Sequence, residues 1–484
     1  MNTSLVSNSS GDIKNGFYIN PILKGNYADP SIIRVDDNYY MVNTSYKYLP
    51  GLIIWHSKDL VNWQPISTAL DKLVGDVWAP EFVYYEDMYY IYFPANKTNW
   101  VVTAKDPKGP WSEPINLNTK YIDPGHVVGP DNKRYLHLSG GHMVQLSDDG
   151  LSIVGEIQKV YEPWKYPDDW EVEAFSPEGP KLTYRTGYYY MTIAVGGTAG
   201  PPTSHMVASS RSKTPWGPWE HSPYNPIIKT SSKEERWWSQ GHGTLVDTLL
   251  GEWWMIFHAY ESGFQTLGRQ TLLLPIEWTE GGWYKVPNGI SVEQAIKKPL
   301  GESLSHGLPI KDNFEGEKVG YQWQTYGEVN RERFEVANRS LTITGHNENN
   351  VAPLLYMALD KAYEVEIDVS VEENVEGKFM LYYNETAFLG LSVTTEGIQH
   401  FRTFKKYKVI PYEGKTVRLK IKNNHHIISF YYLDKIGRWK KYDKVLEASG
   451  FHHNTLGGFL SLRIGLEAIG EGKATFKNFE YRQL

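Results

Sequence analysis

The sequence contains no cysteine in its 484 residues. A disulfide framework, a zinc site built from thiolates and a cysteine nucleophile are therefore excluded. No apolar run approaches the roughly 20 residues that a membrane-spanning helix requires. The formal net charge of −7 provides no basic surface, which argues against nucleic acid or an anionic membrane as a partner.

The N-terminal sequence, residues 1–16, also lacks the basic and apolar regions of a secretory signal peptide. We therefore expect a cytoplasmic protein from the sequence as written, and a periplasmic or secreted one if a leader was removed.

Helix signals are scarce, whereas aromatic residues are abundant. The chain has 17 Trp and 34 Tyr, and 15 of the Trp lie before residue 301. A single Trp is as well explained by a β-rich core as by a ligand. The surplus as a whole favours stacking on sugar or on another flat, weakly polar ligand.

Five segments share one plan of a small polar loop, an aromatic-rich strand and a second strand. They begin at Asp36, Glu86, Pro130, Arg185 and Leu250. Quasi-repeats of about 50 residues, each supplying a small antiparallel sheet, predict a five-bladed β-propeller over residues 17–300. A β-sandwich would not produce so long a period.

The segment 297–309, KKPLGESLSHGLP, breaks this pattern and is interpreted as an interdomain linker. Beyond it, runs such as KAYEVEIDVSVE, KFMLYYNET and TVRLKIKNN are typical of longer antiparallel strands with one wet face. The predicted fold is therefore all-β, with a propeller followed by a β-sandwich at residues 309–484.

A polar residue stands eight to twelve residues upstream of each aromatic strand. Four are acids and one is a histidine: Asp29, Glu81, Asp123, Glu178 and His242. The innermost strands of a propeller surround its channel, so residues at one phase of the repeats converge on the axis. Any one of these residues alone is explained by its preference for turns. Five polar residues at the same position of successive repeats favour a functional centre.

Converging carboxylates are suited to glycoside hydrolysis. One carboxylic acid protonates the leaving oxygen, and another carboxylate activates water or attacks carbon. Like-charge repulsion raises the pKa of at least one of them, which suits a general acid at neutral pH.

With these residues in view, residues 17–300 resemble family 43 of the glycoside hydrolases. The phrases that carry the resemblance are NPILKGNYADPSIIR, GLIIWHSKDLVNW, VWAPEF, YIDPG, SPEGPKL, GHGTLVD, EWWMIFHAY and LGRQTLLLPIEW. Residues 309–484 resemble the concanavalin-like β-sandwich that follows many family-43 propellers, through DNFEGEKVGYQWQ and ATFKNFEYRQL.

The resemblance implies an inverting, single-displacement mechanism. Asp29 would be the general base, Glu178 the general acid, and Asp123 the residue that orients Glu178 and keeps its pKa raised. The acid and base carboxyls of an inverting enzyme stand roughly 6.5–9.5 Å apart. Glu81 matches an acidic position outside the catalytic three and is interpreted as structural.

The resemblance also implies residues that bind the sugar. Arg269 matches an arginine that reaches into the pocket, although a salt bridge between strands also explains it. Trp78 matches a pocket-wall aromatic, and Tyr46 or Tyr48 would play the same part from the first blade. Thr198 is a further expected sugar contact.

No cofactor is expected to be required. His242 has two interpretations: contact with a structural calcium near the axis, or a packed, hydrogen-bonded histidine. Calcium prefers oxygen ligands, so a single imidazole provides little of a calcium site.

The expected substrate is a pentose-containing oligo- or polysaccharide of plant hemicellulose, from which a terminal α-L-arabinofuranosyl or β-D-xylosyl residue is removed. Several alternatives stay open: an endo-acting arabinanase or xylanase, a galactan-directed hydrolase, a transferase or lyase on the same propeller, as in related propellers with fructosyl chemistry, a silent carbohydrate binder and a protein-interaction propeller.

Overall fold

The computed structural model of the chain describes residues 11–346 and 351–484. Residues 1–10, part of the segment on which the leader expectation rests, lie outside the described residues. No helix in the described part is long and apolar enough to cross a membrane. The described chain divides into two compact units, residues 11–262 with 269–306, and residues 263–268 with 307–484.

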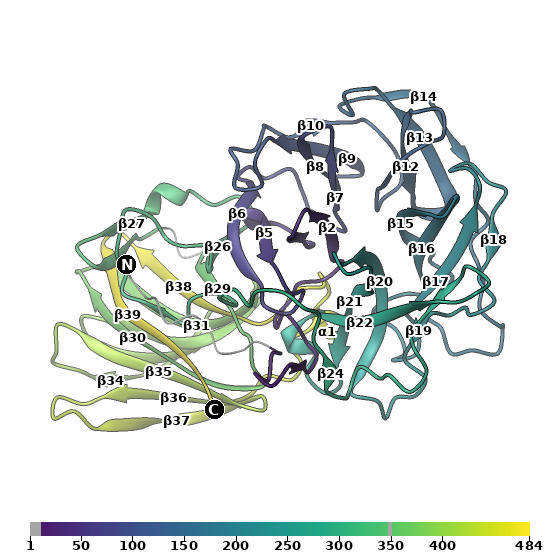
Figure 1. The fold of residues 1–484 in the computed structure, drawn as a ribbon. Coiled ribbons are helices and arrows are strands. Elements are labelled where there is room, and N and C mark those ends of the chain that lie inside the picture. The colour runs from purple at the N-terminus through teal and green to yellow at the C-terminus, as the bar shows by residue number, and fades with distance from the viewer. Residues whose placement is uncertain (1–10, 347–350) are drawn as a thin grey trace. The chain divides into compact units, whose positions relative to one another are not determined.

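The first unit is a five-bladed β-propeller, as predicted (Figure 1). Blade 1 contains β2 (Ser31–Val35), β3 (Asn38–Val42), β5 (Gly51–Ser57) and β6 (Gln64–Leu70). Blade 2 contains β7 (Glu81–Tyr85), β8 (Met88–Ala95), β9 (Thr98–Ala104) and β10 (Ile115–Asn116). Blade 3 contains β11 (Gly125–Val128), β12 (Arg134–Leu138), β13 (His142–Leu146) and β14 (Ile153–Lys159).

Blade 4 contains β15 (Glu178–Arg185), β16 (Tyr188–Val195), β17 (Met206–Ser212), β18 (Glu220–His221) and β19 (Ile228–Lys229). Blade 5 contains β20 (Trp237–Asp247), β21 (Trp253–Glu261), β22 (Gln270–Trp278) and β23 (Tyr284–Lys285). Each blade is thus formed by one continuous segment of the chain, and its strands pair antiparallel in chain order, apart from β19, which pairs with β17.

Tight turns explain why each repeat folds as a hairpin. Between β7 and β8, Glu86 and Asp87 both have positive φ, and Thr186 and Gly187 do so between β15 and β16. Two-residue turns of this handedness match the right-handed twist of the strands that they join. The small polar loops noted in the repeats are these turns.

The apolar faces of neighbouring blades pack into shared cores. Ile54 of blade 1 and Phe82 and Ile91 of blade 2 belong to one such cluster. Tyr92 of blade 2 and Leu136 of blade 3 belong to the next. Many of the abundant aromatics are therefore core residues, and Trp55, Trp63 and Trp237 are fully buried.

The ring closes between its first and last blades without exchanging a strand of either blade. β1 (Phe17–Tyr18) pairs with β24 (Ile296–Lys297), and Leu23 forms a bridge with Thr271 of β22. Arg34 of blade 1 donates to both carboxylate oxygens of Asp247 of blade 5, at 3.1 and 2.8 Å.

The second unit is the predicted β-sandwich. One sheet runs in the order β27 (Phe334–Ala337), β28 (Ser340–Thr344), β39 (Lys473–Gln483), β30 (Ala362–Val371), β35 (Val417–Asn424), β36 (Ile427–Leu433), β37 (Trp439–Glu447), with β25 (Lys311–Asp312) also on β39. The other sheet includes, in order, β34 (Lys405–Pro411), β33 (Gly397–Arg402), β32 (Ala387–Thr394), β31 (Val375–Asn384), β38 (Arg463–Gly470), β29 (Leu354–Met357), β26 (Trp323–Tyr326).

The alternating burial predicted for the sandwich strands holds for β35 but fails for β31. In β35 buried and half-exposed residues alternate along nearly the whole strand. In β31 every residue except the last is buried. Its continuous apolar run FMLYY is the pattern of a strand that is covered on both faces, so the expectation of one wet face was wrong there.

Candidate active site

The five polar residues at a shared phase lie at equivalent places in the propeller. Glu81 and Glu178 begin the innermost strands β7 and β15. Asp29 and Asp123 each precede an innermost strand, β2 and β11, by two residues, and His242 lies within the innermost strand β20. The propeller thus gathers them at its axis.

Three of these residues have an unusual backbone conformation. The φ angles are 53° at Asp29, 59° at Asp123 and 57° at His242. Side chains other than glycine rarely adopt this left-handed region, although Asp and His are among those that tolerate it. Such conformations concentrate at functional sites, where the surrounding structure imposes them.

Asp29 is buried within a set of polar and cationic partners. Its Oδ1 lies 3.1 Å from Nη1 of Arg269, 3.1 Å from Nδ1 of His258 and 3.3 Å from Nδ1 of His242. Its Oδ2 accepts a hydrogen bond of 2.5 Å from the hydroxyl of Thr44. Its backbone N–H donates to Nδ1 of His258 at 3.0 Å.

These partners determine the protonation state of Asp29. Burial alone would raise the pKa of the carboxyl, but the charge of Arg269 and the two histidines hold that pKa well below its usual range. Asp29 is therefore an ionised carboxylate at neutral pH.

Asp123 and Glu178 have the opposite character. Burial and the charge of Asp29 raise the pKa of Asp123 to about 7. Burial and the charges of Asp123 and Asp29 raise the pKa of Glu178 well above its usual range. The Oδ2 of Asp123 also accepts a hydrogen bond of 3.1 Å from the backbone N–H of Gly179, the residue after Glu178.

Arg269 joins two predicted site residues. Its Nη1 donates to Asp29, and its Nη2 donates to the hydroxyl of Tyr46 at 3.1 Å. The backbone of Tyr46 pairs with Val77, so that Trp78 follows directly on a residue bound to Tyr46. Tyr48 packs edge-on against Tyr46, with ring centroids 6.3 Å apart. Because Tyr46 and Tyr48 are both buried, their part as pocket walls stays a prediction, as does the sugar contact of Thr198.

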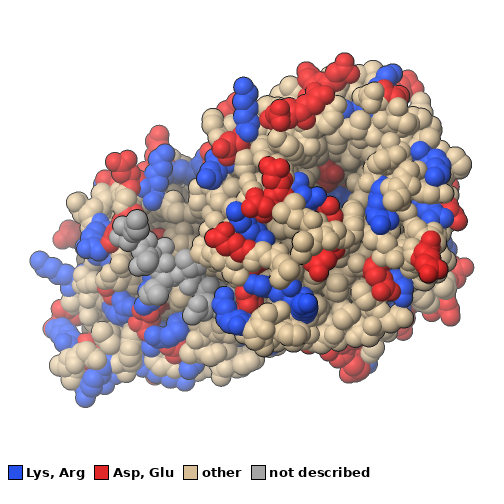
Figure 2. All heavy atoms as spheres, viewed as in Figure 1, with Lys and Arg blue, Asp and Glu red and all other residues tan. Residues whose placement is uncertain are grey.

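Exposed aromatic side chains accompany the acidic residues. Trp78, Tyr121 and Phe175 are 42%, 43% and 43% exposed and stand two or three residues before Glu81, Asp123 and Glu178 respectively. Tyr121 stacks on His142 with ring centroids 3.7 Å apart. Figure 2 shows that the propeller is hollowed on the face in view, with Asp or Glu atoms visible inside the hollow.

His242 is buried beside other imidazoles. A Cβ on Gly179 would lie 2.6 Å from its Nε2, and Gly179 also has positive φ, so glycine is needed there. Ligand atoms of Glu178, His205 and His242 lie within 4.8 Å of one another. Two imidazoles and one carboxylate oxygen do not fit calcium, which takes six to eight oxygen ligands.

The sequence analysis missed His205 and His258. His258 lies on β21, the second strand of blade 5, and contacts Asp29. His205 precedes β17 and stacks on His258 with ring centroids 5.2 Å apart. Neither residue belongs to an innermost strand, so the shared phase of the repeats does not reveal it.

A propeller that gathers one ionised carboxylate and two carboxyls of raised pKa at its axis has the arrangement of a glycoside-cleaving enzyme. The model of glycosyl hydrolases family 43 matches residues 18–284, and that of the beta xylosidase C-terminal concanavalin A-like domain matches residues 311–482. The chain belongs to family 43 of the glycosyl hydrolases, which confirms the resemblance.

The relatives of the chain include proteins named arabinofuranosidase and proteins named xylosidase. The chain is 32% identical over 335 residues to a non-reducing end alpha-L-arabinofuranosidase, BoGH43B, of Bacteroides ovatus, covering 63% of this chain and 60% of that protein. It is 32% identical over 339 residues to a xylan 1,3-beta-xylosidase of a Vibrio species, covering 60% of each. The matched region thus spans about 60% of the length of these curated relatives.

A solved structure matches almost the whole chain. The GH43 protein BlXynB of Bacillus licheniformis has a TM-score of 0.88 at 26% identity, and the match covers 97% of this chain and 100% of that one.

Proposed function

We propose that the protein is an inverting, exo-acting glycoside hydrolase that removes terminal α-L-arabinofuranosyl or β-D-xylosyl residues from hemicellulose or its oligosaccharides. The observation that carries the proposal is the divergence of pKa among three carboxyls at one axis. Asp29 is held ionised, while the pKa values of Asp123 and Glu178 are raised. Carboxyls whose environments push their pKa values apart are what acid and base catalysis at one pH require.

Asp29 acts as the general base. Its ionised carboxylate takes a proton from the attacking water as the water oxygen bonds to the anomeric carbon. Arg269 and Thr44 fix the orientation of the carboxylate through their hydrogen bonds. A rigid base of defined orientation lowers the cost of reaching the transition state.

Glu178 acts as the general acid. Its raised pKa keeps the carboxyl protonated, and it donates that proton to the glycosidic oxygen as the bond to the anomeric carbon breaks. We place Asp123 as the residue that keeps Glu178 protonated, through its charge, and that fixes the start of β15, through Gly179. The roughly 6.5–9.5 Å separation of acid and base in an inverting site stays a prediction.

The sugar is proposed from the relatives. One is named an arabinofuranosidase and another a xylosidase, so we propose that the terminal sugar is either arabinofuranose or xylose. The proposed sugar-binding residues are Arg269, Trp78, Tyr46, Tyr48, Thr198 and His242.

The test is hydrolysis of p-nitrophenyl α-L-arabinofuranoside and p-nitrophenyl β-D-xyloside by the wild type, Asp29→Ala and Glu178→Ala. Turnover of either glycoside that both substitutions abolish supports the proposal, and the NMR spectrum of the first-formed sugar should show the inverted anomer. Full activity in either variant would overturn the assignment. Sugar binding without hydrolysis would indicate a silent binder, and cleavage of polymers alone an endo-acting enzyme.

No step of this mechanism requires a metal. Because Glu178, His205 and His242 do not form a calcium site, we expect the rates on both glycosides to be unchanged after dialysis against EDTA. A loss of activity that calcium restores would show that His242 serves an ion after all.

A further inference from the structure

A buried ion pair joins the innermost strands of blades 2 and 4. The Nζ of Lys181 lies 2.6 Å from Oε2 of Glu81, and the two side chains are only 3% and 10% exposed. Lys181 lies on β15 three residues after Glu178. The mechanism above uses neither member of the pair.

The pair also reaches blades 1 and 3. Lys181 donates to the carbonyl of Pro80 at 2.8 Å and to that of Pro124, the residue after Asp123, at 3.4 Å. Glu81 accepts hydrogen bonds from the backbone N–H of His126 at 3.1 Å and from the hydroxyl of Ser31 at 3.2 Å.

These contacts attach the pair to the chain next to each candidate catalytic carboxyl. Ser31 is two residues from Asp29, Pro124 adjoins Asp123, and Lys181 is three residues from Glu178. Four innermost strands that would otherwise move with their own blades are therefore held to one another at the level of the site.

The charge of Lys181 also acts on Asp123. Burial and Asp29 raise the pKa of Asp123, and Lys181 is the first of the groups that oppose this rise. The charge of Asp123 is in turn the first electrostatic contribution, after burial, to the raised pKa of Glu178.

We propose that Glu81 and Lys181 are positioning residues that hold the three carboxyls in register and keep Asp123 ionised, so that Glu178 retains its proton. The proposal rests on the proposed function and adds to it a group that touches no substrate. Packing alone does not account for the pair, because a buried ion pair is often no more stabilising than apolar residues of the same volume.

The experiment compares Lys181→Met, Glu81→Gln, the double variant and Lys181→Arg by the pH dependence of kcat/KM on the more active aryl glycoside. Without Lys181, Asp123 ionises only at higher pH, so the acidic limb should move up by about one pH unit. Without Glu81, the charge of Lys181 acts alone and the limb should move down. The double variant should lie near the wild type, and Lys181→Arg should restore the limb.

A pair that served packing alone would lower kcat, or the melting temperature, in every variant without moving the limb, and that result would overturn the proposal. Lys298→Met is the matched control, because it removes a lysine that lies 2.9 Å from Asp12 and 3.1 Å from Asp59. It should cost stability and leave the pH profile unchanged.

The failure of the proposed function is distinguishable from the failure of this inference. If the wild type cleaves neither glycoside, the proposed function fails, and the inference is then decided by the carboxyl carbon NMR titration of Asp123. A titration midpoint that is the same in the wild type, Lys181→Met and Glu81→Gln would overturn the inference. Where Lys181→Met does not fold, Glu81→Gln tests the shift by itself, with the charge-conserving Lys181→Arg as the unshifted control.

Discussion

Both units of the molecule bury carboxylates, but they treat them in opposite ways. In the sandwich, Glu467 is fully buried, and its Oε1 lies 2.6 Å from Nη2 of Arg333 and accepts from the N–H of Ala468 at 2.8 Å. Its Oε2 accepts from the N–H of Ala352 at 2.6 Å. At the propeller axis, burial raises the pKa values of Asp123 and Glu178, and the negative charges of neighbouring carboxylates raise them further.

The difference separates structural from functional burial. When all the hydrogen bonds of a buried carboxylate are satisfied, they offset the free-energy cost of removing it from water. Such a carboxylate is compatible with a purely structural role. Carboxyls buried together are costly, and they persist where chemistry requires perturbed pKa values. Substitutions at both kinds of carboxyl test whether this division holds.

The largest expected effect is on activity. Glu178→Gln removes the transferable proton and should lower kcat by about 10³-fold or more, while the melting temperature stays within a few degrees of the wild type or rises. Rates on the two aryl glycosides and calorimetry measure both quantities. A large loss of stability would place Glu178 with the structural carboxylates.

Glu467→Gln should do the reverse. It leaves Arg333 buried without its counter-charge, which costs about 3–5 kcal/mol in the free energy of unfolding. Denaturant unfolding followed by circular dichroism measures this loss. A change in the pH profile of kcat/KM would contradict the assignment of Glu467 to structure.

Asp123→Asn should have an effect on stability whose size depends on pH. The folded state raises the pKa of Asp123 from 3.8 to about 7, so the folded wild type binds more protons and loses stability as the pH rises through this window. The variant should gain roughly 4 kcal/mol at pH 8 and less than about 1 kcal/mol near pH 4. Thermal melts of the wild type and the variant at pH 8 and pH 4 measure the gain in stability. An equal gain at both pH values would exclude an electrostatic cause.

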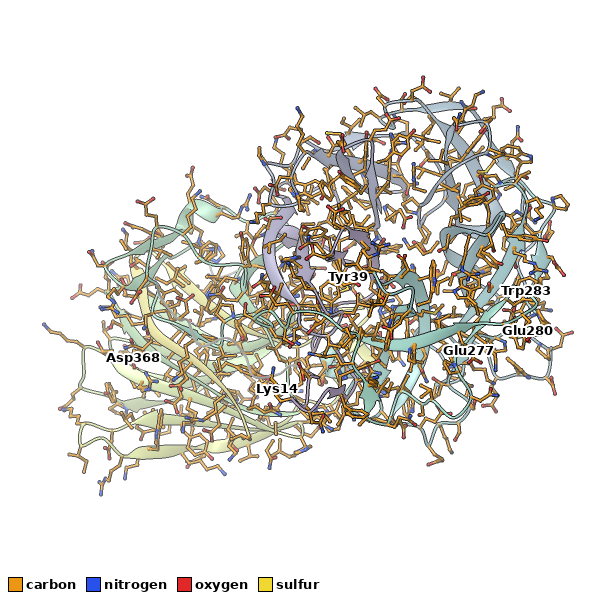
Figure 3. The ribbon with its side chains drawn as sticks, in the orientation of Figure 1. Lys14, Tyr39, Glu277, Glu280, Trp283 and Asp368 are labelled. Carbon is orange, nitrogen blue, oxygen red and sulfur yellow. The ribbon has the colours of Figure 1, made fainter. Side chains whose placement is uncertain are left out.

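The smallest effect is expected on the charged face of β30 and β35. Asp368, labelled in Figure 3, lies 3.0 Å from Nη1 of Arg418, and both side chains are partly exposed. Asp368→Asn should cost less than about 1 kcal/mol, and salt should reduce that cost. A larger loss in urea unfolding would make this exposed pair energetically similar to Glu467.

The sequence predicted the architecture because the repeats are local. Each blade is one continuous segment, so the period of the aromatic strands and the polar loops between them were visible without any tertiary information. The shared phase of Asp29, Asp123 and Glu178 followed from the same period.

What the sequence could not reveal depends on contacts across the ring. His258 reaches Asp29 from 229 positions away, and Lys181 reaches Glu81 from 100 positions away. Neither residue type marks a repeat, and only the closed propeller brings them together. Likewise, the hydrogen bond that the Tyr46 hydroxyl accepts from Arg269 joins residues 223 positions apart and has no signal in the sequence.

The joint between the first and last blades has a consequence for inactivation by heat. Asp29 comes from blade 1, while Arg269, His242 and His258 come from blade 5. Asp29 therefore lies where the first and last blades meet, and a brief separation of the two blades, with the sheet of each blade intact, would remove its partners. A sugar bound to residues of both blades would stabilise the closed ring. Substrate should therefore protect the enzyme against thermal inactivation at temperatures well below those that unfold the blades.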